Sequence, residues 1–89
     1  QYRSWLDVTG REYQRLVRHS ELGRHTLLDP YGATSPVEFF AVATESFFEQ
    51  PVELHRFHPE LYEVLKRYFH QDPAERLLQA DEESRKVVD

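Results

Sequence analysis

The chain has 89 residues, enough for one small domain with a modest buried core. Sixteen acidic and eleven basic side chains give a net charge of −5, and the scattered basic residues argue against a nucleic-acid partner. Cysteine is absent, which excludes a disulfide framework and a thiolate metal site. No apolar run approaches the length of a membrane span, so we expect a cytoplasmic protein without a membrane partner.

An amphipathic helix is the first expected element, over about residues 4–21. One face collects its apolar side chains: Trp5, Tyr13, Leu16 and Val17. The charged side chains are expected outside that face: Arg11, Glu12, Arg15 and Arg18. Gly10 is expected to weaken or break the helix. A loop over residues 23–35 follows, with turn residues at positions 29–32.

The second helix has the clearest start signal in the chain. Ser35 is the expected N-cap, Pro36 suits the first helical position, and Glu38 completes a capping box. Pro51 ends the helix after about Gln50. At 100° per residue, one narrow stripe carries Glu38, Val42, Glu45 and Glu49. The rest is mostly Phe and Ala, and so short a chain cannot cover all four of its Phe side chains.

The rest of the chain is also predicted to be helical. We expect a short turn over residues 51–54, a helix from Pro59 to about His70, and a short last helix. The helix from Pro59 carries apolar side chains at core-like spacing: Leu61, Tyr62, Leu65, Tyr68 and Phe69. Asp72 and Pro73 start that last helix, which carries Leu77 and Leu78. No segment reads as a strand, so the predicted fold is a small all-α domain of about four helices over residues 1–80. The charged residues 81–89 are expected to form a mobile tail.

The spacing of residues alone gives only weak candidates for catalytic or metal-binding residues. The carboxylates Glu38, Glu45 and Glu49 share a face, but such stripes are usually solvated. His55 and His58 stand three residues apart, but Pro59 disfavours helical geometry at His58. No His-Glu-x-x-His motif, serine nucleophile motif or glycine-rich phosphate loop occurs. We therefore expect the five histidines to be surface or partly packed side chains.

A longer pattern is more specific. Residues 28–51, LDPYGATSPVEFFAVATESFFEQP, resemble the Mlc titration factor A family of zinc-dependent metallopeptidases, which are of the gluzincin type. The likeness continues through residues 58–77, HPELYEVLKRYFHQDPAERL, and more loosely to Trp5 and Glu12-Tyr13. It covers nearly the whole chain except the tail.

The resemblance implies a catalytic zinc ion held by two histidines of a His-Glu-x-x-His helix and by a later glutamate. The position that matches this glutamate is Glu38, and Tyr31 matches a tyrosine near the metal that would stabilise the developing oxyanion. Glu45 matches a second acidic position, for which a supporting role is implied. The implied reaction is aminopeptidase-like hydrolysis of peptide bonds. Besides the peptide substrate, the resemblance implies a transcriptional repressor as a protein partner.

The resemblance also implies a part of the active site that these residues do not supply. The chain begins at Gln1 without methionine, and both histidines are expected in a preceding segment of the same protein. One glutamate cannot hold zinc tightly, so we expect the isolated chain to be inactive. An alternative is a non-catalytic helical interaction module, related to a regulator of a transcriptional repressor, whose Phe-rich helix binds a protein partner.

Overall fold

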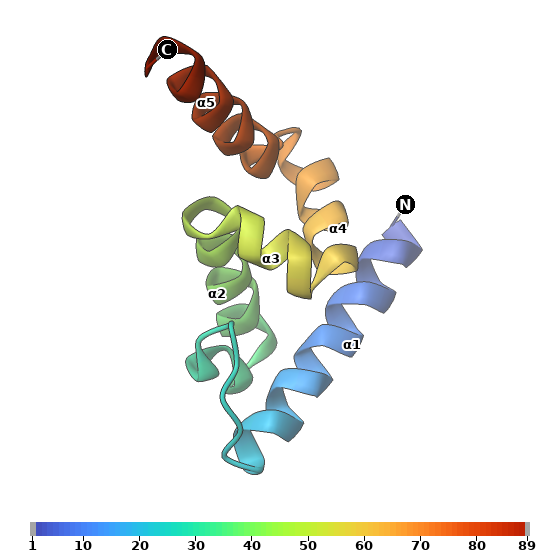
Figure 1. Cartoon of the computed structure of the whole chain (residues 1–89). Helices are drawn as coiled ribbons and strands as arrows, with labels where there is room; N and C mark the ends of the chain where they lie inside the picture. The colour runs from blue at the N-terminus through green and yellow to red at the C-terminus, as the bar shows by residue number, and fades with distance from the viewer. Residues whose placement is uncertain (1, 89) are drawn as a thin grey trace.

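Helices make up most of the molecule, as Figure 1 shows. The structure is a computed structural model that describes the backbone of residues 2–88 and the side-chain environments of residues 4–85. Its elements are α1 (Tyr2–Glu21), the short 3₁₀ helix η1 (Pro30–Ala33), α2 (Pro36–Glu49), α3 (Pro51–Phe57), α4 (Pro59–Phe69) and α5 (Pro73–Val88). Residues 2–88 contain no strand, which confirms the all-α prediction. Within that range no helix has both the length and the hydrophobicity needed to cross a bilayer.

Proline sets where most of the helices begin. A proline occupies the first position of α2, α3, α4 and α5, where its missing N–H costs no hydrogen bond. Single residues join α2 to α3 and α3 to α4, and these joints are Gln50 and His58. Both joints leave helical geometry, with φ of −140° and −138°, because a following proline disfavours the α region. The chain therefore turns sharply twice while remaining almost wholly helical.

The core lies where α1, α2, α3 and α4 meet. Its most completely buried side chains come from the last three of these helices: Phe47, Leu54, Leu61, Tyr62 and Leu65. Val8 and Leu16 of α1 and Leu28 of the following loop complete one side of the core. On α2, Phe39 and Phe47 are buried whereas Phe40 and Phe48 are exposed. This confirms that the chain cannot cover every Phe of α2.

Three sequence-based expectations are wrong. Gly10 does not interrupt α1, which is continuous from Tyr2 to Glu21. Tyr68, assigned to the core by its spacing, is 57% exposed. Glu12, expected outside the apolar face of α1, is only 7% exposed, because it has a partner on another part of the chain.

The last helix is longer than expected. α5 runs to Val88, so it includes residues 81–88, which the sequence predicted to belong to a separate tail. Its start contacts α3, and the rest projects away from the other helices (Figure 1). The side chains of residues 75–85 are exposed, including Leu77 and Leu78. Mobility of this segment stays a prediction, and residue 89 lies outside the described residues.

A buried tyrosine holds the start of α5 against α4. The Tyr62 hydroxyl donates a hydrogen bond to Asp72 Oδ1 at 2.5 Å and accepts one from the Ala74 N–H at 3.0 Å. Burial, followed by the hydrogen bond to Asp72, raises the pKa of Tyr62 to about 12. That same hydrogen bond is the largest cause that lowers the pKa of Asp72. Lys66 Nζ lies 3.5 Å from the other Asp72 oxygen and adds to this effect.

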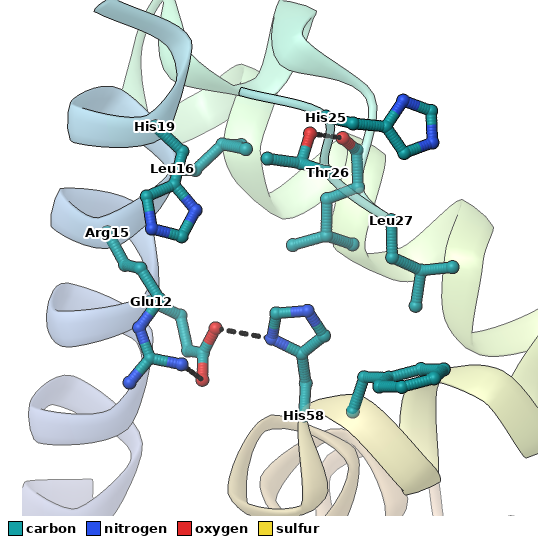
Figure 2. Close-up of a pocket in the computed structure, with 10 residues that line it drawn as sticks. Glu12, Arg15, Leu16, His19, His25, Thr26, Leu27 and His58 are labelled. Atoms are coloured by element: carbon teal, nitrogen blue, oxygen red, sulfur yellow. Dashed lines mark hydrogen bonds and ion pairs between the residues drawn. The ribbon is translucent and has the colours of Figure 1, made fainter. Parts of the chain in front are cut away.

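A second contact joins α1 to the joint between α3 and α4 (Figure 2). His58 Nδ1 lies 2.8 Å from Glu12 Oε1, and both side chains are largely buried. Arg15 approaches the other Glu12 oxygen at 3.9 Å. At the neighbouring position of α1, Arg11 forms an ion pair with Glu60 of α4 that is exposed to solvent. The buried pair is the stronger constraint, because solvent screens the exposed one.

The substitution Tyr62→Phe should lower the free energy of unfolding by about 1–3 kcal/mol, because it removes one hydrogen bond and leaves the Ala74 N–H without its acceptor. Urea unfolding followed by circular dichroism measures this change. Tyr68→Phe is the matched control on the same helix, and its exposed hydroxyl predicts a change within about 0.5 kcal/mol. Equal stability of the Tyr62→Phe variant and the wild type would contradict the role of this hydroxyl.

The same contact predicts how stability depends on pH. The folded pKa of Asp72 lies below its ordinary value of 3.8, so its contribution is present above that pH and is lost as pH falls through the folded pKa. The folded pKa of Tyr62 is raised from 10.0 to about 12, so its contribution is present below pH 10.0 and is lost as pH rises towards about 12. The stability difference between the wild type and Asp72→Asn should therefore shrink in acid. Unfolding curves collected from neutral pH to about pH 2 test this, and a constant difference would contradict it.

The substitution Glu12→Ala should destabilise the fold by about 1–3 kcal/mol, because it leaves the largely buried His58 ring without its partner. Glu60→Ala is the matched control, since it breaks the exposed bridge between α1 and α4 and should cost no more than about 1 kcal/mol. Thermal unfolding of both variants distinguishes the two costs. Equal losses would show that burial of the Glu12–His58 pair has no special effect.

Candidate functional site

Tyr31 stands on η1, whose shape is fixed by its own side chains. Asp29 accepts a hydrogen bond from the Tyr31 N–H at 2.9 Å, and Pro30 fixes the backbone between them. The Tyr31 carbonyl accepts bonds from both the N–H and the hydroxyl of Thr34. The Tyr31 side chain itself is 58% exposed. The backbone of η1 is thus held firmly, while the phenol remains accessible from solvent.

Gly32 seats η1 between α1 and α2. It is buried, and a Cβ at this position would stand 3.1 Å from Leu16 Cδ2 and 3.2 Å from Val42 Cβ. Both distances are shorter than ordinary van der Waals contact. The backbone of η1 therefore lies directly against α2. This close approach fixes the position of the Tyr31 backbone relative to that helix.

Glu38 occupies the third position of α2. Its backbone N–H donates to Ser35 Oγ at 3.2 Å, which confirms Ser35 as the N-cap. The second half of the predicted capping box is absent, since the Glu38 carboxylate is not bonded to the Ser35 N–H. This carboxylate is half-buried and makes no hydrogen bond or ion pair with any residue that the structure describes. Glu38 is thus an available oxygen donor at the start of a rigid helix.

Glu45 lies on α2 about two turns beyond Glu38. Its side chain is exposed and borders a groove of about 280 Å³ between α2 and the loop that precedes η1. Glu49 lies one turn further and borders the same groove. The three carboxylates follow the predicted stripe, but Val42 within that stripe is buried.

No metal site is complete within the part of the chain that the structure describes. Among those residues, no three His, Cys, Asp or Glu side chains are grouped so that they could hold a metal ion. Glu38 suits zinc as a single carboxylate ligand, but a catalytic zinc site takes three protein ligands. The roles predicted for Tyr31, Glu38 and Glu45 therefore stay predictions.

A pocket of about 440 Å³ contains three of the histidines (Figure 2). His19, His25 and His58 border it, together with the Glu12 carboxylate and apolar side chains such as Phe57. The sequence reading missed the Glu12–His58 pair. Glu12 and His58 are 46 positions apart, and no local pattern connects them.

Comparison with known proteins places these features in a family. Residues 1–70 match the family described as glucose-regulated metallo-peptidase M90. An uncharacterised protein of Synechocystis is 47% identical over 72 residues, which are 81% of this chain and 26% of that protein. Proteins named Mlc titration factor A are also similar. That of Serratia proteamaculans is 45% identical over 56 residues, 61% of this chain and 21% of its own length. That of Pectobacterium atrosepticum is 42% identical over 50 residues, 56% of this chain and 19% of its own length.

The chain spans only about a fifth to a quarter of the length of these relatives. No solved structure matches the chain significantly. The family match nevertheless covers most of the sequence, including η1, α2, α3 and α4, and it agrees with the resemblance found from the sequence. The chain belongs to the glucose-regulated metallopeptidase M90 family.

Proposed function

We propose that this chain is the C-terminal portion of a zinc-dependent peptidase and that Glu38 is one of the zinc ligands. The main support is the state of the Glu38 carboxylate, which is half-buried, lies in the family-matched segment and has no partner among the described residues. The Glu38 oxygens are not among the buried atoms that lack a partner, so they can be reached from outside the described residues and are available to bind a metal ion.

The other ligands are proposed to come from a different part of the protein. A two-histidine, one-glutamate set leaves one coordination position open for chemistry. Zinc in such a site supplies Lewis-acid chemistry, activating water and polarising the peptide carbonyl. Glu38 would contribute one oxygen donor and one negative charge, while α2 keeps that donor at a fixed position. The chain alone supplies one ligand, and we propose that it is inactive by itself.

Tyr31 is proposed to act on the substrate rather than on the metal. Its phenol is exposed, and its backbone is fixed by Asp29, Thr34 and the close seating of Gly32 on α2. A hydroxyl held in this way can donate a hydrogen bond to the oxygen of a peptide carbonyl as negative charge develops there. The proposed substrate class is therefore a peptide, cleaved in an aminopeptidase-like reaction. Glu45 is proposed to support the site from the same helix, and binding of a transcriptional repressor remains a separate prediction.

In the complete protein, Glu38→Gln should reduce the zinc content strongly while the helical content stays the same, because an amide is a much weaker zinc ligand than a carboxylate. Zinc is measured by elemental analysis after dialysis, and helical content by circular dichroism. Glu49→Gln is the matched control on the same helix and should retain zinc. If Glu38→Gln binds as much zinc as the wild type, the ligand assignment is wrong.

Tyr31→Phe in the complete protein should lower kcat by roughly 10²–10³-fold, by analogy with the loss of one oxyanion donor in other peptidases. Zinc content and KM should change little, since the phenol is proposed to act mainly in the transition state. Steady-state kinetics on a peptide substrate, with zinc measured on the same samples, separate these quantities. Loss of zinc with loss of rate would instead make Tyr31 part of the metal site.

A further inference from the structure

The pocket that contains three of the histidines is separate from the residues proposed for catalysis. It lies between α1, the loop before η1 and the joint between α3 and α4 (Figure 2). Its volume of about 440 Å³ falls in the size range of sites that hold small molecules. Tyr31, Glu38 and Glu45 do not border it. The pocket therefore has no role in the function proposed above.

Two side chains of α1 bring unused hydrogen-bond donors to this pocket. Arg15 and His19 are one helical turn apart, so they lie on the same side of α1. Neither side chain makes a hydrogen bond with any residue that the structure describes, since Arg15 Nη1 lies 3.9 Å from Glu12 Oε2. A guanidinium carries five N–H donors, and even a neutral imidazole carries one. Both side chains are therefore available to a ligand.

The acidic group in the pocket already faces partners. Among the described residues that border the pocket, Glu12 is the one carboxylate. One of its oxygens is 2.8 Å from His58 Nδ1, the other faces Arg15, and the residue is only 7% exposed. The polar groups that remain without a hydrogen bond are thus the donors of Arg15 and His19. They favour a negatively charged group on the ligand over a positively charged one.

The side of the pocket opposite α1 is apolar. Leu27 and Leu28 border it from the loop, and Phe57 borders it from the end of α3. Figure 2 shows Leu27 across the pocket from His19. Phe57 is 61% exposed, so a ligand that covers its ring removes apolar surface from water. The pocket thus combines donors on one side with apolar surface on the other.

We propose that this pocket binds a small carboxylate that carries an apolar tail. The carboxylate accepts hydrogen bonds from Arg15 and His19, and the tail lies against Leu27 and Phe57. A guanidinium suits this ligand, because two of its parallel N–H groups can meet both carboxylate oxygens. The same chemical group occurs in a free alkyl carboxylic acid and at the carboxyl end of a peptide whose last residue is apolar. The zinc-ligand role of Glu38 is independent of this site.

The first test compares ligands that differ in charge or in tail length. In isothermal titration calorimetry with the complete protein, hexanoate should bind at least roughly tenfold more tightly than hexylamine, which reverses the charge, and than acetate, which lacks the tail. N-acetyl-alanyl-leucine, compared with its carboxyl-terminal amide, represents a peptide end, and the tighter of the two carboxylates identifies the source. Equal or tighter binding of hexylamine, or no binding of either carboxylate, would overturn the proposal.

Matched variants separate this pocket from any other carboxylate site, such as a metal ion. Arg15→Met should weaken hexanoate binding by roughly tenfold or more, whereas Arg18→Met, on the same helix but outside the pocket, should leave it unchanged. Phe57→Ser should weaken the binding of hexanoate, whereas Phe48→Ser should not. All four side chains are exposed, so each variant should keep its helical content in circular dichroism. Unchanged hexanoate affinity in Arg15→Met would show that the ligand binds elsewhere and would refute the assignment.

Discussion

The arrangement of this molecule depends on the burial of α2. That helix is apolar around most of its circumference, and water disfavours exposure of so much aromatic surface. Among the described residues, α3, α4 and η1 pack against it, and α1 adds the ring contacts Trp5–Phe40 and Tyr13–Phe39. They bury Phe39, Val42, Ala43 and Phe47, and they leave Phe40 and Phe48 exposed. The same packing therefore produces the core and leaves part of the aromatic surface of α2 exposed.

The covering is possible because the chain reverses direction within very short distances. Proline after Gln50 and after His58 forces two sharp joints, which bring α3 and α4 back against α2. The Glu12–His58 pair then fixes α1 to the second joint, and Gly32 allows η1 to lie directly on α2. As a result, Tyr31 and Glu38 are carried on elements with little freedom, which is what a catalytic site requires of its supporting residues.

Local signals predicted the helix starts well and the long-range contacts poorly. Ser35, Pro36, Pro59 and Pro73 marked helix starts because capping and the proline ring act on neighbouring residues. The burial of Glu12 and the exposure of Tyr68 could not be predicted, because each depends on a helix distant in sequence. For the candidate site, a resemblance over residues 28–51 identified Tyr31, Glu38 and Glu45, whereas spacing alone did not distinguish Glu38 from an ordinary cap. The structure adds that the Glu38 carboxylate is free, which no pattern in the sequence showed.

We propose that this chain carries one ligand of a metal site whose other ligands lie elsewhere in the complete protein. Zinc content and aminopeptidase activity should be measured side by side on this chain and on the complete protein. We expect about one zinc per molecule and peptide hydrolysis in the complete protein, with neither in the isolated chain. A complete protein without zinc or activity would refute this proposal, and so would an isolated chain that binds zinc tightly.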